Sequence, residues 1–434
     1  MKSPVRLKNV DDVRDPNSLL GHRPFILFWF ARVFTAIAFQ VSTVAVGWQV
    51  YALTRSPFAL GMVGLTQFLP MLVLTVAAGH VADRYDRRLI VRTCQGVMGL
   101  AVGLLALGNF TGSVHTAQIY AVVALIGACR SFEHPTMSAL LPGLIEESLL
   151  PKAAARMASA TQTAFIIGPA LGGLLYTAGP TAAYTAAASL FISAAVFSTL
   201  IPTGHITSSP AKGSNSLFSG ITFIRSRPAV LGAISLDLFA VLLGGATALL
   251  PVYARDILHT GPWGLGLLRS APALGALSMS IIIARCPMQR NIGHKMFAGV
   301  IVFGIATIIF GLSTSLILSI SALVVLGAAD VVSVVIRMPL VQLATPDPLR
   351  GRVSAVNSLF VGTSNQLGEF ESGVTAALLG TVPAVLIGGL GTIAVALVWM
   401  RLFPELLQTD NFAIWSSLPF RTPCADGSAR LTNK

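Results

Sequence analysis

The chain has 434 residues, of which 54% are apolar and only 11% are charged. Soluble domains carry about a quarter charged residues, so this composition excludes a water-soluble globular protein. The net charge of +12 would suit a nucleic-acid-binding protein. However, no basic cluster is interleaved with aromatic residues on a polar face, so nucleic-acid binding is not expected.

Apolar runs long enough to cross a bilayer follow one another along the chain, separated by breaks rich in Pro, Gly and Asn. They predict an all-α polytopic membrane protein with two pseudo-symmetric six-helix halves, divided by the polar segment Pro202–Ser216. The twelve expected helices lie at about residues 25–51, 58–78, 89–108, 116–140, 153–176, 181–200, 229–252, 262–284, 295–313, 316–344, 353–378 and 382–402.

The basic residues predict the orientation of these helices in the membrane. Of 29 Lys and Arg residues, only Arg55 and Arg255 fall in the loops of one side. By the positive-inside rule, the other side and both termini are cytoplasmic. Four further arginines lie deeper within the predicted helices: Arg32, Arg130, Arg269 and Arg337.

Five parts of the chain are expected on this basis. They are a cytoplasmic tail at 1–24, an N-terminal half at 25–201, a central cytoplasmic linker at 202–228, a C-terminal half at 229–402 and a cytoplasmic tail at 403–434. In the linker, Leu217, Ile221 and Ile224 recur at helical spacing beside Arg225 and Arg227. This spacing predicts a short amphipathic helix, lying either on the membrane surface or against the protein.

No metal or catalytic motif stands out in the sequence. His-Glu-x-x-His and Gly-x-Ser-x-Gly are both absent, so neither an enzyme nor a cofactor is expected. The cysteines have no metal-ligand spacing and are expected to be free thiols: Cys94, Cys129, Cys286 and Cys424.

The two halves repeat each other at an offset of about 200 residues, which favours an internal duplication. Val63–Pro70 reads like Leu265–Pro272, and Gly127 before Arg130 matches Gly327 before Asp330.

The most specific stretch is Gly79–Arg88, which places five charges in its last six residues between two apolar runs. Gly79 allows a close approach or an unusual backbone angle. Asp83 can accept hydrogen bonds from free N–H groups at a helix start. A plain cytoplasmic hairpin would also carry arginines, but without this ordered spacing.

This pattern resembles the loop between helices 2 and 3 of the major facilitator superfamily, where it forms a cytoplasmic gate that locks the two halves together. The match runs through Gly79, Asp83, Arg84, Arg87 and Arg88. Asp86 stands where the superfamily usually has glycine, as in the branch that includes enterobactin-exporter-like and macrolide-efflux-like transporters. The loop Thr345–Ala355 is also similar to the loop between helices 10 and 11 of that branch. The resemblance covers roughly residues 20–402.

A second resemblance lies in the fifth predicted helix, where a Gly-Pro-x-x-Gly-Gly element is similar to one in antiporters of the superfamily. The antiporter pattern has glycine where Ala155 and Ala164 stand here, which weakens the exchange interpretation. Small residues also permit close helix contact, so a packing role is predicted. The element consists of Gly168, Pro169, Gly172 and Gly173.

Ionisable groups inside a bilayer cost on the order of 3 kcal/mol or more, so each needs a partner or water. Arg32 and Asp237 occupy corresponding positions in helices 1 and 7, which face each other in the superfamily. We therefore expect either an Arg32–Asp237 pair across the halves or separate partners within each half. Asp330 and Arg337 are two turns apart and share a helix face.

Arg130 and Glu133 are three residues apart and share a face of the fourth helix. They either neutralise each other or line a cavity with His134, where they would bind an anionic substrate group.

The eleventh helix is the most polar of the twelve. Its polar stripe includes Asn365 and Glu369, whereas Glu371 lies about 200° away around an ideal helix. A carboxyl in an apolar site can exchange protons near neutral pH, so Glu369 is predicted to carry protons. The alternative is a structural carboxylate bonded to Asn365 or to an arginine. In the related branch an acid often precedes Gln40, but this chain has Phe39 there.

The resemblance implies a secondary transporter that exports a small amphipathic organic molecule, such as a drug or siderophore, by alternating access with proton antiport. Uptake, facilitated diffusion or a non-transporting sensor remain alternatives. The expected partners are the substrate, protons and the lipid of a bacterial inner membrane, and the protein is expected to be a monomer. The expected substrate-cavity residues are Arg32, Gln40, Arg130, Glu133, Asp237, Asp330, Arg337 and Asn365, and the expected proton-coupling residues are Glu369 and Asp237.

Overall fold

The computed structural model describes residues 19, 22–202, 217–286, 288 and 290–407, and these residues contain helices and no strand. The long helices are α1 (Arg23–Thr54), α2 (Pro57–Arg84), α3 (Arg87–Thr111), α4 (Thr116–Leu140), α5 (Leu150–Thr177), α6 (Pro180–Thr199), α8 (Pro228–Leu243), α10 (Gly261–Arg285), α11 (Ile292–Leu312), α12 (Leu316–Leu343), α13 (Asp347–Leu379) and α14 (Thr381–Leu402). The short elements are η3 (Leu141–Gly143), η4 (Glu147–Leu149), α7 (Leu217–Ser226), η5 (Ala246–Leu249), α9 (Leu250–Val252), η6 (Tyr253–Ile257) and α15 (Pro404–Leu407).

Ten stretches of the described residues are long and apolar enough to cross a membrane. Helices α4 and α13 fall outside this set, and both carry charged side chains in their interiors, such as Arg130 and Glu369. Both nevertheless pack along α2 inside the bundle. With these two helices, the described residues contain the twelve long helices that the sequence predicts.

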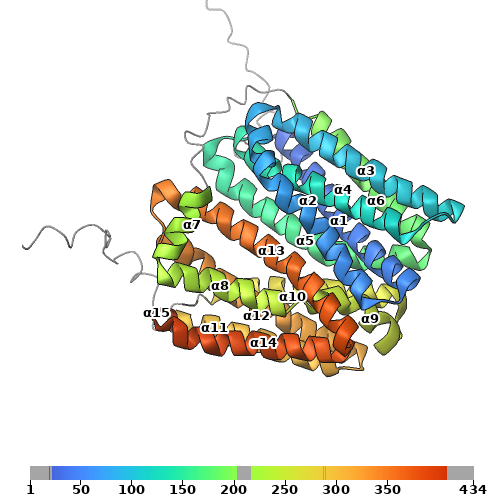
Figure 1. Cartoon of the computed structure of the whole chain (residues 1–434). Helices are drawn as coiled ribbons and strands as arrows, with labels where there is room; N and C mark the ends of the chain where they lie inside the picture. The colour runs from blue at the N-terminus through green and yellow to red at the C-terminus, as the bar shows by residue number, and fades with distance from the viewer. Residues whose placement is uncertain (1–18, 20–21, 203–216, 287, 289, 408–434) are drawn as a thin grey trace, which may run out of the picture.

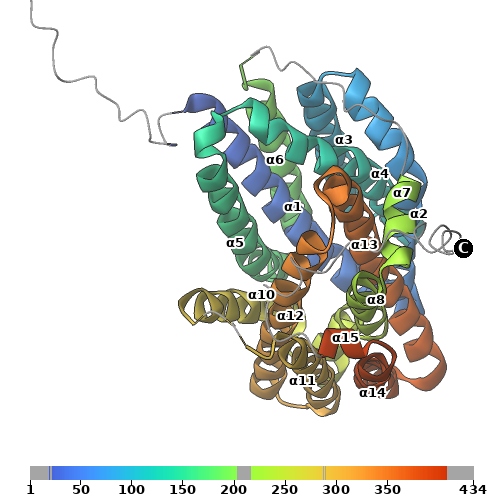
Figure 2. The same ribbon diagram turned by 90° about the vertical axis from the view of Figure 1, so that its left-hand side faces the viewer.

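The long helices pack in two groups, α1 to α6 and α8 to α14. The groups meet mainly along two helix pairs, α2 with α13 and α5 with α10. In Figure 1 the first group, coloured blue to green, lies above the second, with α7 and α15 at one end and α9 at the other. We call these the linker end and the far end. Figure 2 views the two groups from the linker end.

Each group is tied together internally by buried polar side chains. In the first group, Gln95 donates to Thr35 (2.9 Å) and accepts from Ser198 (2.7 Å), which joins α3 to α1 and α6. In the second, the Trp399 indole donates to Ser235 (3.0 Å) and joins α14 to α8. A buried polar group without a partner is costly, so these satisfied bonds favour two internally rigid halves.

The predicted helix at 229–252 is not continuous. Helix α8 ends at Leu243, and the chain then passes through Gly244, Gly245, η5, α9 and the π-helical η6. A Cβ at Gly245 would overlap the Gly368 carbonyl oxygen, so this segment rests directly on the backbone of α13. Residues 238–252 carry no charged side chain on either side of the break, and hydropathy therefore gave no sign of it.

Two predicted loops are mostly helical. Helix α2 continues to Arg84 and α3 begins at Arg87, so the stretch Gly79–Arg88 turns only at Tyr85 and Asp86. Likewise α13 begins at Asp347, so most of Thr345–Ala355 is helical.

The predicted tails and linker lie largely outside the described residues, as does Cys424. The three described cysteines, Cys94, Cys129 and Cys286, are free thiols. Helix α7 packs on α13, and Ile224 of α7 is buried there (2% exposed). The Leu217 side chain lies outside the described part.

Candidate functional site

The interface between the halves is closely packed toward the far end. On α5 and α10, Ser270 donates to the Ile166 carbonyl (2.6 Å) and Gln162 donates to the Ala273 carbonyl (2.9 Å). Nearer the far end, a Cβ built on Gly173 would lie 2.9 Å from the Gly266 Cα. Real Cβ atoms do not approach so closely, which means that the two backbones touch at glycine.

The α2–α13 pair repeats this arrangement. A Cβ on Gly61 would lie 3.0 Å from the Gly373 Cα, and one on Gly64 would lie 2.9 Å from the Glu369 Cβ. The other two glycines of the Gly-Pro-x-x-Gly-Gly element face α1 instead: a Cβ on Gly168 would crowd Gln40, and one on Gly172 would crowd Val41. The element therefore lies where α5 meets both α1 and α10.

At the linker end, Asp86 caps the start of helix α3. Its carboxylate accepts from the Arg88 backbone N–H (2.9 Å) and side chain (3.2 Å) at the start of α3. Arg88 also donates to the Ile201 carbonyl (3.1 Å), and Arg87 donates to the Ala139 carbonyl (3.0 Å). These bonds join parts of the same half.

Of the gate candidates whose side chains are described, Gly79 and Arg84 have no hydrogen bond or ion pair to a described residue of the other half. Nothing lies within 4 Å of a Cβ built on Gly79, and Arg84 is exposed. The Asp83 side chain lies outside the described part of the chain.

Basic groups gather in the N-terminal half. The Arg130 guanidinium lies 3.9 Å from the Phe39 ring centroid, a cation–π contact. Arg130 attracts Glu133 and is repelled by Arg32, and both arginines act on His134. Glu133 is buried (2% exposed), and its Oε1 has no hydrogen-bond partner among the described residues. The structure therefore shows no direct Arg130–Glu133 ion pair, and positive charge exceeds negative charge in this region.

The C-terminal half pairs its own charges. Asp237 of α8 forms an ion pair with Arg337 of α12, and both side chains are less than a tenth exposed. The expected Arg32–Asp237 pair is therefore wrong for this structure, and the alternative of a partner within the same half holds for Asp237. Helix α12 packs beside α8, which places Arg337 within reach. Asp330 and Asp237 line one small cavity.

Glu369 and Glu371 have different surroundings. The Glu369 carboxylate lies 3.1 Å from the position of a Cβ on Gly64 and attracts Arg269 of α10. Glu371 accepts a hydrogen bond from Thr375 on its own helix (2.8 Å). Asn365 is exposed and donates to the Val361 carbonyl (2.9 Å). The structure thus places Glu369 at the contact between the halves and Glu371 in a local bond.

Arg269 is a residue that the sequence analysis did not place at the site. Its Nε is buried without a hydrogen-bond partner among the described residues. The feature of the sequence that could have identified Arg269 is its position, since it is one of four arginines deep within the predicted helices.

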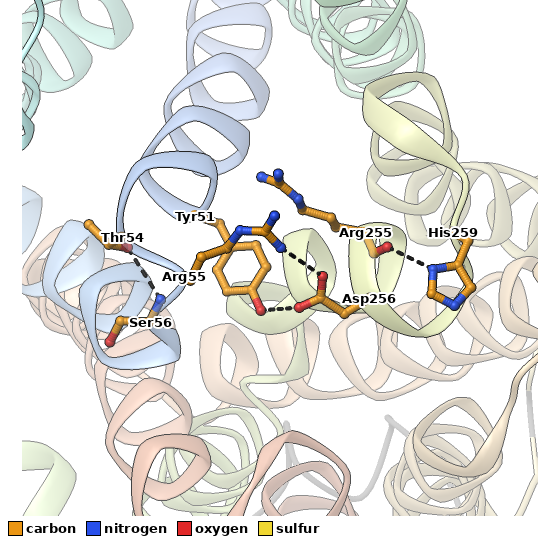
Figure 3. Close-up of polar contacts among 7 residues, drawn as sticks. All are labelled: Tyr51, Thr54, Arg55, Ser56, Arg255, Asp256 and His259. Carbon is orange, nitrogen blue, oxygen red and sulfur yellow. Dashed lines mark hydrogen bonds and ion pairs between the residues drawn. The ribbon is translucent and has the colours of Figure 1, made fainter.

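A polar contact across the halves also lies at the far end, where α1 meets η6 (Figure 3). Asp256 accepts a hydrogen bond from the Tyr51 hydroxyl and forms an ion pair with Arg55 (3.4 Å). Arg255 lies 5.8 Å from the Trp48 ring. The sequence marked Arg55 and Arg255 as the only basic residues in the outer loops but did not connect them to Asp256 or Tyr51.

Replacing Asp256 by alanine is expected to favour a state in which the far end is open. The change removes both bonds that tie α1 to η6. A hydrogen bond to a charged group contributes about 1.5–3 kcal/mol, so a shift of about tenfold or more is expected. Spin labels on cysteines at Ser113 and Thr314, in a chain without native cysteines, should show a larger population with a longer distance between the two labels.

Arg55→Gln should have a smaller effect, since an exposed ion pair contributes about 0–1 kcal/mol. Identical distance distributions in Asp256→Ala and the parent would contradict a closing role.

Two rigid groups of helices, joined near one end and carrying ionisable groups where they meet, define a membrane transporter of the major facilitator fold. The family model described as transmembrane secretion effector matches residues 16–429, and the chain belongs to this family. The resemblance and the fold predicted from the sequence are thereby confirmed, and the protein is a transporter and not an enzyme.

Similar proteins agree with this assignment. The enterobactin exporter EntS of Citrobacter koseri is 24% identical over 394 residues, which cover 89% of this chain and 94% of that protein. EntS of Escherichia coli O1:K1 has the same identity and coverage.

Solved structures share the fold. A bacterial homologue of the lysosomal transporter Spinster, inward-facing and occupied, has a TM-score of 0.71 at 12% identity, covering 89% of this chain and 98% of its own. A point mutant of the nucleoside transporter NupG has a TM-score of 0.70 at 13% identity, and the match covers 88% of this chain and 100% of the NupG chain. An inward-facing bacterial homologue of the iron transporter ferroportin has a TM-score of 0.65 at 16% identity, and the match covers 92% of this chain and 100% of that protein's chain.

Proposed function

We propose that this protein exports a small amphipathic organic anion from a bacterial cell across the inner membrane, in exchange for protons. The observation that carries the proposal is the interface: two internally bonded halves meet through backbone contacts near one end, with charged side chains beside them. Such an interface suits alternating access, in which the halves rock around a central site. The exporter names of the relatives support the direction.

The orientation follows from the basic residues. Arg84, Arg87 and Arg88 lie at the linker end, which we assign to the cytoplasm. The hydrogen bonds and glycine contacts between the halves then close the periplasmic side, and the described arrangement faces inward. In the opposite state, the stretch Gly79–Arg88 would close the cytoplasmic side, as its resemblance to the family gate implies.

The substrate's negative group would bind on the N-terminal half. Arg32 and Arg130 bring more positive charge there than Glu133 balances, and both arginines act on the neighbouring His134. The Phe39 ring under Arg130 supplies an apolar surface. This combination suits an anion carried on an aromatic body. Gln40 and Asn365 remain candidates for polar contacts to the same molecule.

Proton coupling would run through Glu369. Its carboxyl lies where α13 touches α2, and Arg269 is its oppositely charged neighbour. Protonation of Glu369 would release Arg269 from this attraction and change the contact between the halves. The chemistry requires no cofactor.

Everted membrane vesicles test the function. With an acidic interior, wild-type vesicles should accumulate iron-free enterobactin, the molecule in the relatives' name. Arg130→Gln should weaken the apparent affinity at least tenfold, because a lost charged hydrogen bond costs about 1.5–3 kcal/mol. Arg92→Gln, which changes an exposed arginine on α3, is the matched control and should transport normally.

Two results would contradict the proposal. Accumulation only in right-side-out vesicles would indicate uptake. If the protein inserts normally and no member of a panel of aromatic anions is transported in either everted or right-side-out vesicles, the result would indicate a membrane sensor.

A further inference from the structure

We infer that Asp237, Asp330 and Arg337 form a proton-binding site inside the C-terminal half, separate from Glu369. The inference deepens the proposed function and rests on it for the role of the proton in transport. The site itself is defined by contacts within one half, and it can be tested without any transport measurement.

The three side chains come from two neighbouring helices. Asp237 of α8 and Arg337 of α12 form a buried ion pair, and the exposed fractions of their side chains are 9% and 4%. Asp330 lies two turns before Arg337 on α12. It shares with Asp237 a small cavity, whose lining also includes Val300 and Phe303 of α11 and Ser333 of α12.

The charges of this cluster do not balance. Two carboxylates face one guanidinium, and Asp330 forms no hydrogen bond or ion pair with any other described residue. Within the span of a membrane protein, an excess negative charge is costly unless something neutralises it. The cluster therefore requires one positive charge when both carboxylates are ionised.

A proton suits the site better than a metal ion. A bound cation such as Mg²⁺ or Ca²⁺ takes about six or more oxygen ligands. The only polar side chains of the lining are Asp237, Asp330 and Ser333. A proton needs one carboxyl oxygen and leaves the other carboxylate paired with the guanidinium.

In this site the Arg337 guanidinium can interact with the carboxylate of Asp237 or with that of Asp330. Arg337 is 3% exposed, and its Nε has no hydrogen-bond partner among the described residues. The charged groups that act on Asp330 are Asp237 from α8 and Arg337 from its own helix. From α11 the lining receives only the apolar Val300 and Phe303. When the proton leaves Asp330, the guanidinium is drawn toward a second carboxylate.

The position of the cluster links it to the interface. Helix α12 packs along α10, and α8 packs along α13. Helices α10 and α13 make most of the contact with the N-terminal half, through α5 and α2. A movement of Arg337 from one carboxylate to the other would therefore affect both main helix pairs of the interface, α5 with α10 and α2 with α13.

Infrared spectroscopy of the purified, substrate-free protein tests the site. The experiment uses a background with both Glu133→Gln and Glu369→Gln, so that neither of these two carboxyl groups can contribute to the signal of protonated carboxyl groups. The parent should show such a signal at neutral pH, and it should be lost as the pH rises. Asp330→Asn and Asp237→Asn should each remove it, because each leaves one carboxylate for one guanidinium. Glu371→Gln, whose carboxylate is bonded to Thr375, is the control and should keep it.

The outcomes separate this inference from the proposed function. A protonated-carboxyl signal that persists in both Asp330→Asn and Asp237→Asn would overturn the site, whatever the vesicles transport. Suppression of the parent signal by Na⁺ at constant pH would overturn the assignment to a proton. Loss of the signal in both variants, with the thermal unfolding midpoint unchanged, would support the site even if no export were found.

Discussion

Glu369→Gln is expected to abolish uphill export driven by a pH gradient while leaving substrate binding and substrate exchange intact. Glutamine keeps the shape that fits against Gly64 but cannot take up or release a proton. It also mimics the protonated state, in which Arg269 has lost its charged neighbour. Everted vesicles with an imposed gradient measure the first activity, and counterflow without a gradient measures the second.

The neighbouring acid provides the control for this experiment. Glu371→Gln changes a carboxylate that is bonded to Thr375 on its own helix, so it should lower stability or expression rather than coupling. Normal pumping by Glu369→Gln combined with failed pumping by Glu371→Gln would reverse the two assignments. If both variants pump normally, Glu369 is not the coupling residue.

Gly173→Val is expected to shift the protein strongly away from the arrangement described above and to stop most transport. A Cβ at this position would lie 2.9 Å from the Gly266 Cα and 3.0 Å from its nitrogen, and backbone atoms cannot move aside easily. Overpacking of this kind costs about 1–3 kcal/mol, so the two-state balance should change about tenfold or more. The spin-labelled pair at Ser113 and Thr314 should report the longer distance as the main population.

Gly96→Val is the matched substitution. Nothing lies within 4 Å of a Cβ built on Gly96 of α3, so valine should leave both the distance and the transport unchanged. A Gly173→Val protein with the parent's distances and transport rate would show that the glycine contact does not have to form.

Most of the fold could be predicted from the sequence because a bilayer imposes a length and a polarity on each helix. Helix α4 was predicted with its observed bounds, Thr116–Leu140. The break after Leu243 could not be predicted in this way, because hydropathy does not distinguish an apolar helix from an apolar irregular segment. In Gly79–Arg88, the charges indicated a membrane face but not how far α2 continues beyond it.

The candidate site was only partly accessible to sequence reasoning. The internal repeat identified Arg32 and Asp237 as corresponding positions, but correspondence does not show which neighbour a side chain reaches. Arg337 reaches Asp237 because α12 packs beside α8. The bond between Tyr51 and Asp256 joins positions 205 residues apart, and no local pattern indicates it.

The glycine contacts between the halves also bear on the speed of the transport cycle. Gly61 with Gly373, and Gly173 with Gly266, bring backbone against backbone without interlocked side chains. Two such surfaces separate without any side chain having to leave its rotamer, so parting them adds little to the activation barrier. We therefore expect the glycine contacts not to limit turnover, which leaves proton release or substrate dissociation as the expected slow step once the hydrogen bonds between the halves have broken.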